Sequence, residues 1–404
     1  MNTRPVIETS SNPVALSAAF NHDRTCFSVG LESGFCVYNS DPCQLRVARD
    51  LNAGVGAVEM LGRANYVALV GGGKLPKFSQ NKVIIWDDAK QKVAITLECR
   101  SAVLRVRLSR NRIVVVLHNS VHVYNFSSPP ERISVSETAD NPLGLCCLSS
   151  SLLAFPGRTP GQVQLVEVVT GNVTIVPAHA SPLRAIEISP DGEIMATASE
   201  TVSRAFSPVA NLLINPKGTL IRVFTTSNCA RVAELRRGVD HATIFSIAIS
   251  PSSQLLAVTS DKSTLHVFDI PHPTKPARLD ASIATRRLTS MGSGGSLASP
   301  DDSGSQKWGI LGKIPLLPRV FSDVYSFASA HFEIGDEITG GGPQDLVSKG
   351  SKTEKGVIGW TSEQSLIVIG AGRDARWEKY VVAEGEDGKR YCVRDGWKRY
   401  LGTA

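Results

Sequence analysis

The chain has 404 residues, of which 42% are hydrophobic and 20% are charged, a balance typical of a folded globular protein and not of a disordered one. Its net charge of +6 favours binding to an anionic surface, but the chain has no long basic tract that would indicate nucleic acid as the partner. Because it has neither a secretory signal nor an apolar run of about 18 residues, we expect a soluble protein in the cytosol.

Short β-rich runs recur along the chain in pairs. Each pair is an apolar strand, a turn and a second strand, which ends in an aromatic residue followed by Asn, Asp or Thr. The seven pairs occupy residues 26–39, 66–88, 112–126, 152–169, 194–226, 255–270 and 365–385. A period of roughly 40 to 50 residues matches the blades of a propeller, each of four strands.

The repeats therefore predict an all-β fold, a seven-bladed β-propeller of WD40-like repeats that takes up residues 1–404 as one domain. Two packed β-sandwiches are the alternative, which the regular spacing disfavours. A parallel α/β fold is disfavoured as well, because no amphipathic helix separates the strands.

Residues 201–216 interrupt the fifth repeat between Ser199 and Thr219. Without them these two residues would stand four positions apart, the same interval as Ser260 to Thr264 in the sixth repeat. The insertion is either a surface loop, which costs little because closure entropy grows slowly with loop length, or a retained intron, which we favour. Peptides from residues 201–216 in mass spectra of the native protein would exclude the intron.

The composition turns to Pro, Ser, Gly and Arg over residues 271–306. Such a segment cannot bury enough apolar surface to fold alone, so it predicts a long, disordered, membrane-proximal loop of the sixth blade. Trp308, Ile310 and Leu311 follow it among lysines, a mixture suited to the interface of a membrane, and we predict that they form a membrane-insertion loop. The alternative for the second half of this stretch, PLLPRVF, is packing against the ring.

Two adjacent arginines, Arg236 and Arg237, stand near the end of a predicted strand. Neighbouring side chains of a strand point to opposite faces, so the two can serve two separate anion pockets. The planar fork of arginine suits phosphate better than the point charge of lysine. A purely structural role would require acidic partners, and the nearest in sequence are Glu234 and Asp240.

Other chemistry finds little support. The eight cysteines form no CxxC pair and lie at no zinc-ligand spacing to histidine, so we expect no metal site, no cofactor and no disulfide framework. The chain has no GxSxG, HExxH or P-loop motif, and GGGK at residues 71–74 lacks the spacing of a P-loop. We do not expect an enzyme.

These motifs resemble the PROPPIN family, the phosphoinositide-binding β-propellers of autophagy that include the WIPI proteins. The resemblance is carried by LRRG at residues 235–238, by DHATIFSIAIS and LLAVTSDKSTLHVF after it, and by ALVGGGKLPKFSQNKVIIWDD before it. With leucine at position 235, where many members have phenylalanine, the motif resembles that of the branch that contains the later-numbered WIPI paralogues.

The resemblance implies binding of phosphatidylinositol 3-phosphate and phosphatidylinositol 3,5-bisphosphate, one headgroup in each of two sites. The first site would comprise His179, Ser199, Thr219, Arg222 and Arg236. The second would comprise Arg237, His241, Thr243, Ser260, Lys262, Thr264 and His266. Hydroxyls and imidazoles can distinguish a phosphorylated ring position from a free hydroxyl, although the same serines and threonines also suit ordinary turns, and His179 a structural position.

The family also implies a role. The protein would recruit autophagy machinery as a monomer, from the cytoplasm and peripherally on preautophagosomal, endosomal or vacuolar membranes. The first blades would bind an autophagic lipid-transfer protein, with Asn21 and Asp23 in the binding turn, although these residue types also favour ordinary turns. A WD-repeat scaffold that binds proteins and no lipid is the remaining alternative.

Overall fold

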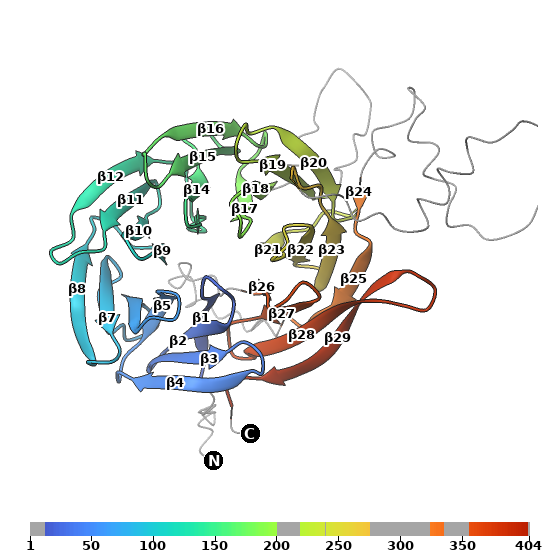
Figure 1. Ribbon diagram of the computed structural model, residues 1–404. Helices are drawn as coiled ribbons and strands as arrows, with labels where there is room; N and C mark the ends of the chain where they lie inside the picture. The colour runs from blue at the N-terminus through green and yellow to red at the C-terminus, as the bar shows by residue number, and fades with distance from the viewer. Residues whose placement is uncertain (1–12, 200–218, 239, 275–323, 335–354, 403–404) are drawn as a thin grey trace, which may run out of the picture.

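The computed structural model describes residues 13–199, 219–238, 240–274, 324–334 and 355–402. Over these residues the strands form seven separate sheets, arranged in chain order around a central axis (Figure 1). The prediction of a seven-bladed β-propeller is confirmed.

Each sheet has four strands, and one has a fifth. The first two blades consist of β1 (Ala15–Phe20), β2 (Cys26–Leu31), β3 (Gly34–Asn39) and β4 (Gln44–Asp50), then β5 (Val55–Met60), β6 (Tyr66–Gly71), β7 (Lys82–Asp87) and β8 (Lys92–Glu98). The next two consist of β9 (Arg105–Leu108), β10 (Arg112–Val116), β11 (Ser120–Asn125) and β12 (Arg132–Glu137), then β13 (Cys147–Leu148), β14 (Leu152–Pro156), β15 (Gln162–Glu167) and β16 (Val173–Pro177).

The last three blades complete the ring. The fifth consists of β17 (Leu183–Ile188), β18 (Ile194–Ser199), β19 (Leu220–Thr225), β20 (Arg231–Arg236) and β24 (Val324–Tyr325). The sixth consists of β21 (Ile244–Ile249), β22 (Leu255–Ser260), β23 (Thr264–Asp269) and β25 (Ala328–His331). The seventh consists of β26 (Val357–Trp360), β27 (Ser365–Ile369), β28 (Arg376–Glu384) and β29 (Arg390–Arg399).

The seven strand pairs read from the sequence are the second and third strands of the seven blades. Second strands are mainly apolar because neighbouring blades cover both of their faces, and every residue of β2 and of β22 is buried. Fourth strands lie at the circumference, and most residues of β4 are exposed. The apolar pattern along the sequence thus distinguishes the buried second strands from the exposed fourth strands.

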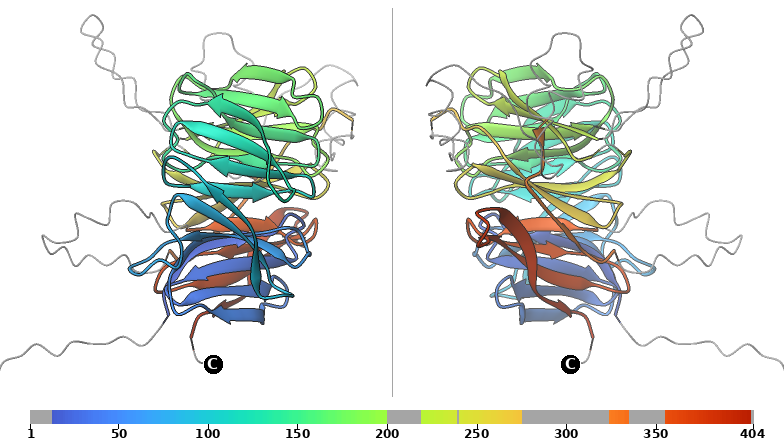
Figure 2. Two further views of the ribbon diagram at one scale, coloured as in Figure 1. Left: turned by 90° about the vertical axis from the view of Figure 1, so that its left-hand side faces the viewer. Right: turned by 90° about the vertical axis from the view of Figure 1, so that its right-hand side faces the viewer.

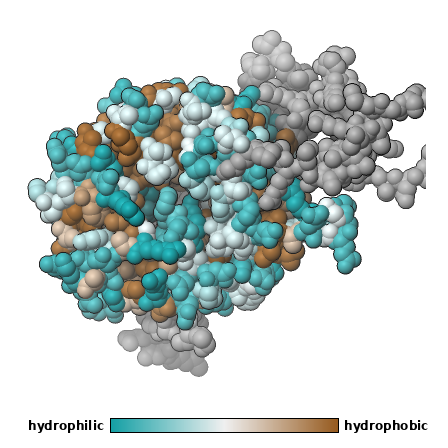
Figure 3. All heavy atoms as spheres, in the orientation of Figure 1, coloured by the Kyte–Doolittle hydropathy of each residue, from teal (hydrophilic) through white to brown (hydrophobic). Residues whose placement is uncertain are grey.

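The edge of the ring keeps some apolar side chains in solvent. Ile133 and Val135 of β12, and Val173 and Ile175 of β16, are each about half exposed. Figure 2 shows the blades edge-on, and Figure 3 shows hydrophobic atoms among hydrophilic ones over the face of the ring.

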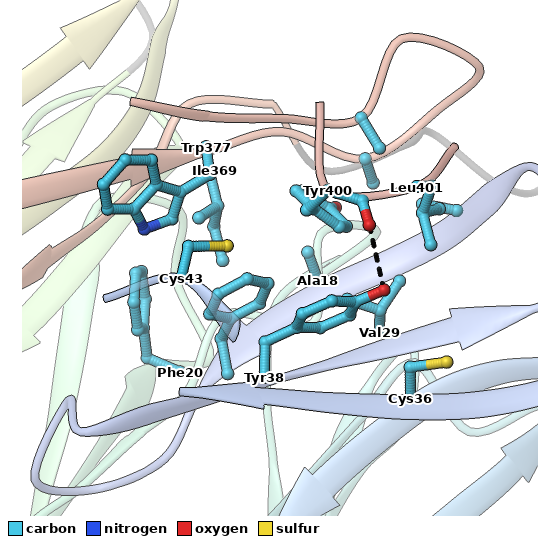
Figure 4. Packing of buried hydrophobic residues seen from close by; sticks show 14 of the residues in the cluster. Ala18, Phe20, Val29, Cys36, Tyr38, Cys43, Ile369, Trp377, Tyr400 and Leu401 are labelled. Atoms are coloured by element: carbon cyan, nitrogen blue, oxygen red, sulfur yellow. Dashed lines mark hydrogen bonds between the residues drawn. The ribbon is translucent and has the colours of Figure 1, made fainter. Parts of the chain in front are cut away.

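The ring closes by packing between its first and last blades (Figure 4). Each of these blades takes its four strands from one continuous part of the chain, so no strand is exchanged between the described ends. Instead, the Tyr38 hydroxyl donates to the carbonyl of Tyr400 at 3.0 Å, and Trp377 Nε1 donates to the carbonyl of Ser40 at 2.8 Å. Phe27 stacks on Tyr38 inside the same cluster.

Several predictions fall on residues that the structure does not describe. Residues 201–216, most of the 271–306 segment, and the predicted insertion residues Trp308, Ile310 and Leu311 lie outside the described ranges. These remain predictions.

Candidate functional site

The fifth and sixth blades present their polar strand ends at one end of the ring. We call this end the arginine rim, defined by Ser199 at the end of β18, Arg236 at the end of β20 and Ser260 at the end of β22. These strands run in the same direction in their blades, because the first and third strands are antiparallel to them. Arg237 follows β20 directly.

Both arginines are buried although their side chains are cationic. Arg236 is 6% exposed and Arg237 is 7% exposed. The ladder alternates along β20: Glu234 contacts Arg222 on the side of the fourth blade, whereas Leu235 packs with Ile244 of the sixth. Arg236 therefore shares the side of Glu234, and Arg237 lies on the side of the sixth blade.

The contacts of Arg237 lie on the sixth blade. Its Nη2 donates to the hydroxyl of Thr264 at 2.6 Å, and that hydroxyl lies 3.2 Å from the hydroxyl of Ser260. Its buried Nε has no hydrogen-bond partner among the described residues. Burial lowers the pKa of the Arg237 guanidinium, while Asp261 and Asp240 act in the opposite direction. An arginine nevertheless stays protonated at neutral pH, so this side of the rim holds a buried cation with an unused donor.

The other predicted members of the second site lie around this cation. His266 is on the same side of β23 as Thr264, and its Nδ1 lies 2.9 Å from the hydroxyl of Ser326. Lys262 and His241 are exposed at the rim. The backbone N–H of Thr243 donates to Asp261 at 2.9 Å, which braces the turn that carries Lys262.

On the side of the fourth blade, two of the predicted first-site residues, His179 and Arg222, are held by hydrogen bonds. His179 Nε2 lies 2.9 Å from the hydroxyl of Thr197. Arg222 donates through Nε to Glu234 at 2.9 Å and through Nη1 to the carbonyl of Ala178 at 2.7 Å. Arg222 thus holds the segment before His179 to the fifth blade. Sequence reasoning missed Thr197, the partner of that histidine, because no local pattern marks it.

Thr219 does not face the fourth blade, as its assignment to the first site would require. Ala198 pairs with Ile221, so the next step along the ladder brings Ser199 beside Leu220, whereas Ser260 pairs with Thr264 itself. Thr219 is fully buried, its hydroxyl donates to the carbonyl of Ala242, and its own carbonyl accepts from the Arg237 N–H at 3.3 Å. Its side chain is therefore directed toward the sixth blade, with Arg237.

Two histidines of the rim give a testable dependence of stability on pH. Burial, with Arg222 nearby, lowers the pKa of His179 to about 4, and burial, with Arg237 nearby, lowers the pKa of His266 to about 4. Between about pH 6.5 and pH 4 the unfolded chain binds more protons at these positions than the folded chain does, so the free energy of unfolding should fall as pH falls through that window.

We expect urea denaturation to show a shallower pH dependence in His179→Asn and His266→Asn than in the wild type. An unchanged slope from pH 6.5 to pH 4 would contradict the burial of neutral imidazoles here.

The turn that contains Asn21 and Asp23 lies at the opposite end of the ring, because it joins a first strand to a second. Asn21 is 2% exposed, and its side chain accepts from the Cys26 N–H at 3.1 Å and donates to the Thr25 hydroxyl at 3.2 Å. Asp23 is half exposed and forms an ion pair of 2.7 Å with Arg63. Asn21 thus stabilises the turn, Asp23 is the member that a partner could reach, and their role in partner binding remains a prediction.

Among the residues that the structure describes, no group of three or more His, Cys, Asp or Glu side chains is placed to hold a metal ion. The same part of the chain contains no helix that is long and apolar enough to span a membrane.

Known proteins resemble this chain over most of its length. The family model described as PROPPIN matches residues 15–291, which include both arginines. SVP1-like protein 2 of Emericella nidulans is 59% identical over 85% of this chain and 99% of its own, and its namesake from Neurospora crassa is 46% identical over 100% and 99%. The solved structure of Kluyveromyces lactis Hsv2 is similar with a TM-score of 0.69 over 96% of this chain and 99% of its own, at 22% identity, which speaks for the fold alone.

Proposed function

Because the chain belongs to the PROPPIN family, we propose that it binds phosphoinositide headgroups at the arginine rim and recruits autophagy machinery to the membranes that carry them. The ligands are phosphatidylinositol 3-phosphate and phosphatidylinositol 3,5-bisphosphate. One headgroup lies on each side of the LRRG motif, with Arg236 in the first pocket and Arg237 in the second.

The observation that carries this proposal is the buried guanidinium of Arg237. Its Nη2 has a neutral hydroxyl as its partner and its Nε has none among the described residues. A buried donor without a partner costs about 1 to 3 kcal/mol, more for a charged group, so an anionic ligand that accepts from it would recover that cost. A phosphate oxygen is such an acceptor, and the hydroxyls of Ser260 and Thr264 stand beside it.

Two pockets on one rigid ring explain how weak headgroup contacts add up to membrane recruitment. Once the first headgroup is bound, the second pocket meets its ligand at a high effective concentration, so the overall avidity exceeds the affinity of either site. Arg236 ends β20 and Arg237 follows it at the same end of the ring, with the Arg237 side chain on the sixth blade, which would let both pockets address one membrane surface.

A panel of vesicles that differ only in the phosphorylated ring position tests the proposal. We expect the protein to float with vesicles containing phosphatidylinositol 3-phosphate or the 3,5-bisphosphate, and at least about tenfold less with vesicles containing unphosphorylated phosphatidylinositol. Equal flotation on all members of the panel would refute a headgroup reader and favour a scaffold that binds only proteins.

A further inference from the structure

The fifth blade carries a fifth strand that comes from far along the chain. β24 pairs in parallel with β20, with Val324 opposite Leu235 and Tyr325 opposite Arg236 (Figure 1). Nearly ninety positions of sequence separate the two partners, and β24 continues directly into the outer strand of the sixth blade. Residues 324–331 thus cross from the edge of one arginine-bearing blade to the edge of the next.

The register of this pairing decides where Tyr325 lies. Residues paired across neighbouring strands project on the same face, so Tyr325 lies on the side of Arg236, toward the fourth blade. Neighbouring strands are about 4.8 Å apart, which is within the reach of two long side chains that converge on one ligand. Arg236 is 6% exposed whereas Tyr325 is 43% exposed, so the phenol stands at the open margin of the first pocket.

The residues after Tyr325 are held firmly. The Ser326 hydroxyl lies 2.9 Å from His266 Nδ1, and the Phe327 N–H donates to the carbonyl of Val267 at 3.0 Å. The guanidinium of Arg390 lies 3.7 Å from the centre of the Phe327 ring and is also paired with Asp269. These contacts fix the backbone that presents Tyr325, and binding would therefore order little more than its side chain.

We propose that Tyr325 is a further binding residue of the first pocket, whose hydroxyl donates a hydrogen bond to an oxygen of the headgroup held by Arg236. The inference rests on the proposed function. A phenol is suited to this place because its rigid ring loses little conformational freedom and its hydroxyl serves both as donor and as acceptor. This hydroxyl would favour ligands that present a hydrogen-bonding oxygen beside the phosphate that Arg236 binds.

The decisive variant is Tyr325→Phe, which removes the hydroxyl and keeps the ring. It is compared in two backgrounds, Arg237→Thr, in which only the first pocket is intact, and Arg236→Thr, in which only the second is. With phosphatidylcholine vesicles that carry phosphatidylinositol 3-phosphate, we expect Tyr325→Phe to weaken binding about threefold to tenfold in the Arg237→Thr background and to change nothing in the Arg236→Thr background.

Tyr391→Phe is the matched control. Tyr391 is an outer-strand tyrosine of the seventh blade with 46% exposure, and its hydroxyl bonds to Asp387. It should leave vesicle binding unchanged, and both tyrosine variants should unfold at the temperature of the wild type.

The outcomes separate the inference from the function on which it rests. Full binding by Tyr325→Phe in the Arg237→Thr background, or an equal loss in both backgrounds, would overturn the role of Tyr325 and leave the arginine pockets standing. A wild-type chain that ignores the phosphoinositide in the vesicles would overturn the proposed function, and the role of Tyr325 with it.

Discussion

Replacing Arg236 and Arg237 together by threonine should abolish recruitment to vesicles that contain phosphatidylinositol 3-phosphate. Hydrogen bonds to charged groups contribute about 1.5 to 3 kcal/mol each, so loss of one such contact per pocket predicts a combined weakening of about 10² to 10⁴-fold. The fold should survive, because threonine suits a strand and the hydrogen-bond partner of the Arg237 side chain among the described residues is the neutral hydroxyl of Thr264, so its removal leaves no buried carboxylate without its partner there. Vesicle flotation and thermal unfolding measure the two effects.

The double variant Arg110→Thr, Arg132→Thr is the matched control, because it also removes two positive charges, but from exposed positions of the third blade. If recruitment depended only on the net charge of the protein, both double variants would lose it to the same extent. We expect the control to bind within about twofold of the wild type at physiological salt, where exposed charges are screened. Undiminished flotation of the Arg236, Arg237 double variant would defeat the assignment of the two pockets.

The fold could be predicted because the repeat appears in local sequence patterns. Second strands are mainly apolar on both faces. Several third strands end near an aromatic residue at which the pairing with the fourth strand shifts register, as at Tyr38, Trp86, Tyr124 and Phe224. The directions of Arg236 and Arg237 follow from the alternation of a strand, which needs no knowledge of the neighbours.

The neighbours themselves could not be read from spacing. Thr219 stands five positions before Phe224, whereas Thr264 stands four before Phe268. This one-residue difference places Thr219 just before β19, with its side chain toward the sixth blade. An interval counted across a turn does not reveal this, because register is set by the ladder and its bulges. The pairing of β24 with β20 was equally hidden, since two residues that pair across so great a separation leave no local pattern.

The junction of the first and last blades should be the most sensitive point of the ring. Trp377 is 7% exposed, packs in the cluster with Phe20, Cys43 and Tyr400, and donates to the carbonyl of Ser40. Trp377→Ala should therefore lower the free energy of unfolding by about 3 to 5 kcal/mol, as is usual for a buried aromatic side chain. That is a large share of the roughly 5 to 15 kcal/mol that keeps a typical protein folded.

Trp397→Ala is the control for this change, because Trp397 is 52% exposed on the adjacent strand β29, where the guanidinium of Arg376 lies over its ring. It should cost about 1 kcal/mol or less in urea denaturation, the usual value of an exposed cation–π contact. Equal losses in the two variants would contradict closure by buried packing. At temperatures below its unfolding transition, Trp377→Ala should still bind phosphoinositide vesicles, because the arginine rim belongs to the fifth and sixth blades and the junction to the first and seventh. Weakened binding by the folded variant would mean that the pockets depend on the closed ring.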